Sequence, residues 1–120
     1  LGPLRVTQAL LPNLRKAKDA KVAVISSRMG SITLAQGGSV AYRTSKAAVN
    51  MVFKLLAGEI AGDGVAVTML HPGWVRTDMG GAGADIDVAT SATGLRAVID
   101  GLSAGNSGKF YDYSGAELPW

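Results

Sequence analysis

The distribution of apolar and polar residues along the chain predicts six regular elements, in which helices and strands alternate. Three segments repeat apolar residues at helical spacing, and three shorter runs are apolar without that spacing. The expected helices cover residues 4–17, 41–61 and 88–102, and the expected strands cover residues 21–26, 65–70 and 108–113. This alternation predicts an α/β fold with a parallel sheet and helices on both faces. The uniformly apolar strands are expected to be buried on both faces.

The expected helix at 41–61 divides its polar and apolar residues unevenly. Its charged and amide side chains fall on one narrow stripe, formed by Arg43, Lys46, Asn50 and Lys54. The remaining arc is apolar and is too wide for one sheet to cover. We therefore expect this helix to pack on the sheet with one side and on another helix, from this chain or a second subunit, with the other. The pattern favours a homo-oligomer.

The composition excludes several classes of protein and of functional site. The chain has 120 residues and no cysteine, which excludes a disulfide scaffold and a thiolate metal site and fits a cytoplasmic location. No apolar run reaches the roughly 18 residues of a membrane span. The net charge is +3, and the one basic cluster consists of Arg15, Lys16, Lys18 and Lys21. No aromatic residues interleave with these cations, so we interpret them as a helix terminus rather than a nucleic-acid site.

The candidates for metal or hydrolytic chemistry are weak. His71 is the only histidine, and without a second ligand we expect it to be structural rather than a general base. Asp85 and Asp87 are too few for a divalent metal site. The glycine-rich segment at residues 79–86 is expected to form a mobile lid.

Tyr42 and Lys46 are the first candidates for a catalytic pair. They stand four residues apart in the expected helix, so their side chains are neighbours on one face. A phenol alone is a poor proton donor at neutral pH, and a nearby ammonium stabilises the phenolate form. Such a pair can move a proton to or from an alcohol or carbonyl oxygen. The alternative is that Lys46 simply lies on the solvated polar stripe.

Two further segments follow expected strands directly. Ser27 comes after the strand at 21–26, and the turn "HPGWVRT" (71–77) comes after the strand at 65–70. The carboxyl ends of parallel strands share one edge of the sheet, where ligands of open α/β folds bind. A Ser27 hydroxyl there can bind the oxygen that Tyr42 protonates. The turn exposes the Val75 backbone and the Thr77 hydroxyl at the same edge.

In order along the chain, "VISSRMG", "YRTSK" and "HPGWVRTDM" resemble the short-chain dehydrogenase/reductase family, especially its small carbonyl-reductase-like members. The resemblance implies the C-terminal half of a Rossmann-like doubly wound parallel sheet. It also implies an oxidoreductase that transfers a hydride between NAD or NADP and a small-molecule carbonyl or alcohol, as a homodimer or homotetramer.

The same resemblance implies a role for each matching residue. Tyr42 would be the general acid/base, and Lys46 would stabilise its phenolate and bind the nicotinamide ribose. Ser27 would orient the substrate carbonyl, with Ser26 and Ser31 as alternatives. The residues expected to line the nicotinamide site are Pro72, Gly73, Val75 and Thr77.

The resemblance further implies that residues 1–120 are one partial domain, whose N-terminal nucleotide-binding half precedes Leu1. We weigh two other functions. One is a non-catalytic truncated module that keeps only the helix-pairing surface. The other is an epimerase or dehydratase that uses the same Tyr–Lys pair.

Overall fold

The computed structural model describes residues 2–120 and contains all six expected elements. They are α1 (Gly2–Leu14), β1 (Lys21–Ile25), α2 (Val40–Glu59), β2 (Ala66–His71), α3 (Val88–Asp100) and β3 (Lys109–Asp112). Three short 3₁₀ helices join them, namely η1 (Arg28–Gly30), η2 (Ala61–Asp63) and η3 (Ala104–Asn106). The ends of the elements differ by up to three residues from the expected ones; α1, for example, passes through Pro12 and ends at Leu14.

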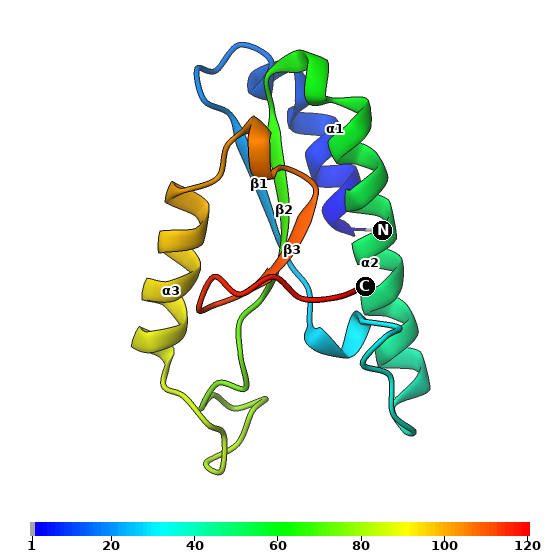
Figure 1. Cartoon of the computed structure of the whole chain (residues 1–120), viewed down its shortest axis with the longest axis vertical. Coiled ribbons are helices and arrows are strands. Elements are labelled where there is room, and N and C mark those ends of the chain that lie inside the picture. The colour runs from blue at the N-terminus through cyan, green and yellow to red at the C-terminus, as the bar shows by residue number, and fades with distance from the viewer. Residues whose placement is uncertain (1) are drawn as a thin grey trace.

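The three strands form one parallel sheet in the order β1-β2-β3. Lys21 pairs with Ala66 at one end of the β1–β2 ladder, and Ile25 pairs with Leu70 at the other. Helices α1 and α2 lie on one side of the sheet, and α3 lies on the other side (Figure 1). The expected α/β class with a parallel sheet is therefore confirmed.

The core lies between α2 and the sheet, and β2 forms its centre. Phe53 of α2 packs in the same cluster as Met69 of β2 and Phe110 of β3, and all three are at most 1% exposed. The expectation of strands buried on both faces holds for β2 and is wrong for β1 and β3: Ile25 of β1 is 48% exposed, and only Phe110 of β3 is buried. In the described part of the chain β1 pairs only with β2 and is therefore an edge strand, so fewer neighbouring residues pack on it than on the central strand β2.

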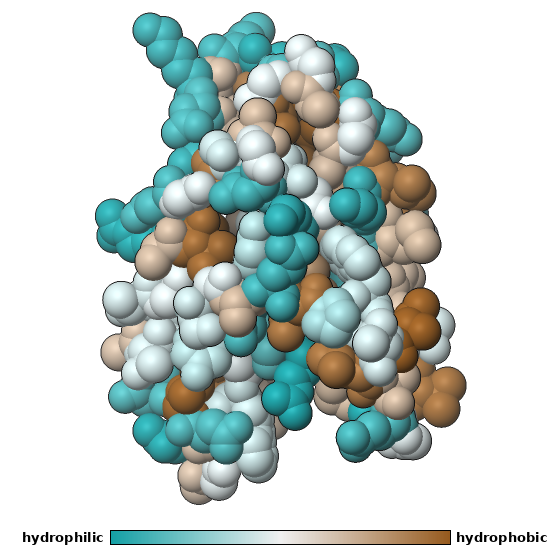
Figure 2. All heavy atoms as spheres, in the orientation of Figure 1, coloured by the Kyte–Doolittle hydropathy of each residue, from teal (hydrophilic) through white to brown (hydrophobic). Residues whose placement is uncertain are grey.

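The polar stripe of α2 is not uniformly solvated: Asn50 is buried, Arg43 and Lys46 are half-buried, and Lys54 is exposed. Asn50 is only 3% exposed, and Lys54 donates through Nζ to the Gly108 carbonyl at 2.9 Å. Part of the apolar arc is instead outside: Met51 and Leu55 are each 59% exposed. Apolar residues accordingly gather along the side of the molecule that α2 forms (Figure 2). The homo-oligomer stays a prediction, now with an exposed apolar face to support it.

The basic cluster lies beyond the last turn of α1, and two of its four cations form ion pairs. Arg15 pairs with Asp63 at 2.9 Å, and Lys21 pairs with Asp19 at 3.3 Å. No helix in residues 2–120 combines the length and the apolar character needed to cross a bilayer.

Candidate active site

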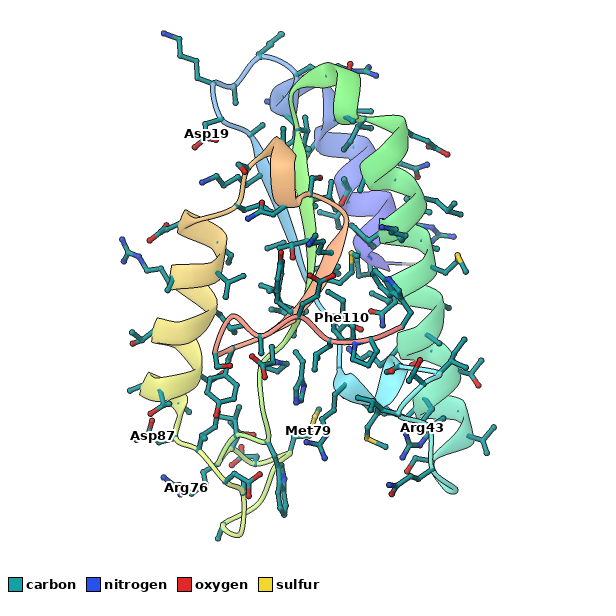
Figure 3. The ribbon with its side chains drawn as sticks, viewed as in Figure 1. Asp19, Arg43, Arg76, Met79, Asp87 and Phe110 are labelled. Atoms are coloured by element: carbon teal, nitrogen blue, oxygen red, sulfur yellow. The ribbon has the colours of Figure 1, made fainter. Side chains whose placement is uncertain are left out.

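The predicted site residues come from three segments that meet at the carboxyl edge of the sheet. Ser27 follows β1, Tyr42 and Lys46 occupy the first turns of α2, and the turn 72–77 follows β2. Figure 3 shows Arg43 of α2 and Met79 and Arg76 of the β2–α3 loop at this same end of the molecule. The parallel topology produces this convergence, because all three strands end there.

Tyr42 and Lys46 lie one helical turn apart, as expected from their spacing. The Lys46 ammonium is 5.8 Å from the centre of the Tyr42 ring, and Tyr42 is 42% exposed. Lys46 also donates through Nζ to the Ile25 carbonyl at 3.2 Å, which ties α2 to the end of β1. This contact directs the ammonium into the edge of the sheet, against the alternative of a merely solvated lysine. An ammonium carries three donors, so two others remain for a ligand.

Ser27 lies directly beyond β1 and is 7% exposed. Its hydroxyl oxygen accepts the Met29 amide at 3.1 Å and so caps η1, which leaves the hydroxyl proton free to be donated. Gly30, at the end of η1, packs on α2: a Cβ there would lie 2.7 Å from the Lys46 carbonyl carbon. The contact sets the position of the Ser27 segment against the turn of α2 that carries Lys46.

The two alternative serines have other contacts. Ser26 donates to the Lys46 carbonyl at 3.5 Å, and the Ser31 oxygen accepts the Leu34 amide at 3.1 Å. Both serines are 2% exposed, less than Ser27. The role of Ser27 stays a prediction, supported by its greater exposure and by its free hydroxyl proton.

The turn after β2 is held by side-chain contacts. The Pro72 carbonyl accepts the Ser91 hydroxyl of α3 at 2.6 Å. Gly73 has φ +85°, a backbone angle that favours glycine, and a Cβ there would also press on the end of the Ile86 side chain at 2.6 Å. Trp74 donates through Nε1 to the Gly80 carbonyl at 2.8 Å. The turn is thereby shaped before any ligand binds.

The expected lid at 79–86 folds back on this turn. Val75 and Ile86 form a parallel bridge, and the Arg76 amide donates to the Ile86 carbonyl at 2.9 Å. The Thr77 hydroxyl oxygen accepts the Gly80 amide at 3.1 Å. Met79, by contrast, is 92% exposed. Opening of this segment stays a prediction. To open, the segment would have to break the Arg76–Ile86 and Thr77–Gly80 hydrogen bonds.

Asp87 has a structural role in this loop. Its carboxylate accepts the Thr90 amide at 2.7 Å and caps α3, and this bond lowers the pKa of Asp87. In residues 2–120 no three histidine or acidic side chains gather where they could hold a metal ion.

His71 ends β2 beside the site, opposite Asp112 of β3. Its Nδ1 is buried without a hydrogen-bond partner in the described residues. Burial lowers the pKa of His71 below its ordinary value, the nearby Arg28 lowers it further, and Asp112 opposes the shift. The imidazole is therefore neutral at physiological pH.

Acidification below about pH 6.5 is expected to destabilise the fold through His71. Because the folded pKa is lowered, the unfolded chain takes up the proton first as the pH falls. The stabilising effect of the neutral imidazole is complete above the unfolded pKa and is lost as the pH falls towards the folded pKa. Urea unfolding from about pH 7.5 to about pH 5 measures this loss. His71→Gln cannot titrate and should flatten the profile; equal slopes in both proteins would contradict the prediction.

Sequence reasoning missed the part that Gly30 plays in this site. Its only signal was a glycine three residues after Ser27, and that signal does not say what the glycine touches. The motifs that identify the site also give no indication that Trp120 contacts the loop after Ser27.

Known proteins share sequence with this chain. The family model described as short chain dehydrogenase matches residues 1–85. The chain is 49% identical to the C-signal of Myxococcus xanthus, over all of this chain and 73% of that protein. It is 41% identical to a 1-hydroxy-2-glutathionyl-2-methyl-3-butene dehydrogenase of Rhodococcus sp., over all of this chain and 54% of that enzyme.

Solved structures match this chain as well. Carbonyl reductase Sniffer of D. melanogaster matches with a TM-score of 0.90 and 38% identity, over 98% of this chain and 52% of that one. An NADPH-bound carbonyl reductase from chicken fatty liver matches with a TM-score of 0.90 and 36% identity over the same shares. This chain thus spans about half the length of these reductases. From the matched residues, the identity and the shared fold, the chain belongs to the short-chain dehydrogenase family.

Proposed function

We propose that the protein containing this chain is an NAD(P)-dependent oxidoreductase that interconverts a carbonyl compound and its alcohol. The observation that carries the proposal is the position of Lys46, which lies beside Tyr42 and is bonded to the end of the strand that leads into Ser27. A tyrosine, an ammonium and a serine hydroxyl at one sheet edge suit proton transfer to a carbonyl oxygen.

Each of the three side chains has a distinct task. In the direction of reduction, Ser27 donates its free hydroxyl proton in a hydrogen bond to the substrate oxygen and orients it. Tyr42 transfers its phenolic proton to that oxygen as the carbonyl carbon is reduced. Lys46 stabilises the phenolate left behind, through the charge of its ammonium. Solvent then returns a proton to Tyr42, which the 42% exposure of this side chain permits.

The cofactor is NAD or NADP, and two residue sets would hold it. Tyr42 and Lys46 would border the nicotinamide ribose, and the two free donors of Lys46 would supply the hydrogen bonds that hold it. The turn residues Pro72, Gly73, Val75 and Thr77 would line the nicotinamide ring. When bound, the nicotinamide supplies or accepts the hydride. The preformed turn after β2 fits a flat ring, and the NADPH-bound relative supports the cofactor class.

The substrate is proposed to be a small or medium-sized apolar carbonyl compound. Trp74 is 53% exposed and Met79 is 92% exposed, and both lie in the loop that borders the site. Two relatives named as carbonyl reductases support this substrate class. A direct test is consumption of NADPH or NADH by the full gene product with a panel of apolar aldehydes and ketones. Absence of turnover with every cofactor and carbonyl pair would contradict the proposal.

Substitution of Lys46 by Ala is expected to weaken cofactor binding and to slow turnover, because one side chain serves both ribose binding and phenolate stabilisation. We expect losses of about tenfold in cofactor affinity and about 100-fold in kcat. Fluorescence titration with the reduced cofactor measures the first and steady-state kinetics the second. Arg43→Ala, in the same turn of α2, is the control and should leave cofactor affinity intact. Unchanged affinity in Lys46→Ala would show that Lys46 does not bind the ribose.

A second candidate is a module that associates without catalysis. Within residues 2–120 the outer edge of β1 has no partner strand, and Met51 and Leu55 are exposed; both features favour this candidate, since both suit contact with another chain. The homo-oligomer belongs to both candidates, and the cysteine-free composition supports a cytoplasmic location for either. Turnover in the assay above separates the two, because the module would associate but would not oxidise the reduced cofactor.

A further inference from the structure

The segment that ends at Trp120 is fastened along β3. Tyr111 and Glu117 form an antiparallel bridge, and the Leu118 amide donates to the Phe110 carbonyl at 2.8 Å. Glu117 pairs with Lys109 at 2.8 Å. The segment then crosses to the side of the molecule where α2 lies (Figure 1). Its path brings it from the sheet to the loop that carries Ser27.

Trp120 itself makes three contacts with three different parts of the fold. Its ring stacks on the buried ring of Phe110, with 5.8 Å between the centres and 23° between the planes. The Lys54 ammonium lies 5.5 Å from the centre of the Trp120 ring. The Trp120 carbonyl accepts the amide of Thr33 at 2.8 Å. The ring is thus anchored to β3 and α2, and the carbonyl holds the loop behind Ser27.

Beyond η1 this loop is held by bonds within itself and to the start of α2, such as Leu34 to Ser31 and Arg43 to Gly38, whereas the Thr33 amide binds the distant Trp120. Gly30 rests on the Lys46 backbone, but the loop then leaves the helix, and residues 32–39 are all exposed. A hollow of about 200 Å³ lies between the loop, α2 and Trp120, lined by Gly30, Ile32, Ala47, Asn50, Met51, Lys54 and Trp120. The hollow separates part of the loop from α2, and the Thr33–Trp120 bond connects the loop to the Trp120 side of this hollow. Figure 3 shows Phe110, the base of the anchor, at the centre of the fold.

From these contacts we propose that Trp120 is a positioning residue for Ser27. Its carbonyl holds the loop through the Thr33 amide, and this keeps η1 packed against the turn of α2 that carries Lys46. The position of the Ser27 hydroxyl relative to Tyr42 is thereby maintained. The inference rests on the proposed function. It predicts a split in the kinetics, because Ser27 acts on the substrate oxygen whereas Tyr42, Lys46 and the turn after β2 hold the cofactor. Loss of the anchor should lower kcat for the carbonyl substrate and leave cofactor affinity intact.

The test compares variants of the full gene product. Trp120→Ala removes the ring anchor, and Thr33→Pro removes the donated amide. Each should lower kcat about tenfold with cofactor affinity changed less than about twofold, because loosening the loop should displace Ser27 by less than the roughly 1 Å that costs about 100-fold. The double variant should lose no more than the single ones, since both break one connection. Thr33→Ala keeps the amide and should restore most of the rate. Glu117→Gln is the control: it breaks the Lys109 pair on the same segment and should leave kcat near wild type.

Hydrogen exchange gives a readout that does not depend on activity. In Trp120→Ala, amides of residues 28–34 should exchange faster, while those of β2 should stay protected. Wild-type kcat in both Trp120→Ala and Thr33→Pro would overturn the inference and leave the proposed function standing. If the wild-type protein turns over no carbonyl compound, the proposed function fails, and exchange decides the structural claim alone. Faster exchange confined to residues 28–34 then supports the anchor, and unchanged exchange overturns it.

Discussion

Substitution of Tyr42 by Phe is expected to reduce turnover by about 10³-fold or more, because it removes the phenolic proton beside Lys46. The ring remains, and so do its packing on α2 and the ammonium contact. Cofactor affinity should therefore change little. Steady-state kinetics and cofactor titration of the full gene product measure the two quantities side by side.

A control for this substitution is Tyr111→Phe. It also removes a phenolic oxygen, but from β3 rather than from α2, which carries Tyr42. It should keep near-normal turnover. If Tyr42→Phe also kept near-normal turnover, proton transfer would have to come from another group, and the proposed mechanism would be wrong. A parallel loss of cofactor affinity would instead mean that the hydroxyl itself holds the ribose.

Substitution of Gly30 by Ala is expected to damage both stability and activity. The new Cβ would lie 2.7 Å from the Lys46 carbonyl carbon and 2.9 Å from the Lys46 Cβ. Since backbone cannot move aside as a flexible side chain can, η1 must shift away from α2, at a cost of about 1–3 kcal/mol. The shift carries Ser27 with it, so kcat should fall by about 100-fold. Thermal unfolding and steady-state kinetics measure the two effects.

The same loop supplies a matched control. Gly37→Ala places a Cβ where no heavy atom lies within 4 Å, so it should leave both the melting temperature and kcat near wild type. Equal stability of Gly30→Ala and Gly37→Ala would show that η1 adapts to the extra carbon. A stable Gly30→Ala protein with normal kcat would remove the argument that this contact positions Ser27.

The elements of this fold were predictable because their signals are local. Helical spacing of apolar residues and short β-branched runs lie within single segments, and each segment forms the structure that its pattern predicts. The ends were less predictable. Pro12 lacks an amide proton, yet α1 continues past it to Leu14, because the preceding turns and the packing of Leu11 and Leu14 on the core support the last turn.

The candidate site was predictable in part for the same reason. Tyr42 and Lys46 are neighbours by helical geometry alone, and Ser27 and the turn at 72–77 follow strands directly. Their meeting at one edge needs only a parallel sheet, which the alternation of elements implied. The wrong expectation for β1 came from reading apolar composition as burial, whereas burial depends on which strands and helices lie beside it.

By itself, then, the chain's pattern of residues determined the α/β class, the order of its elements and the pairing of Tyr42 with Lys46, since these depend on neighbours in the sequence. Only the tertiary structure decided that Asn50 of α2 is buried, that Gly30 touches Lys46 and that Trp120 holds Thr33. Those contacts join residues from separate elements. Their existence depends on how whole elements pack in three dimensions, which no local pattern of apolar and polar residues encodes.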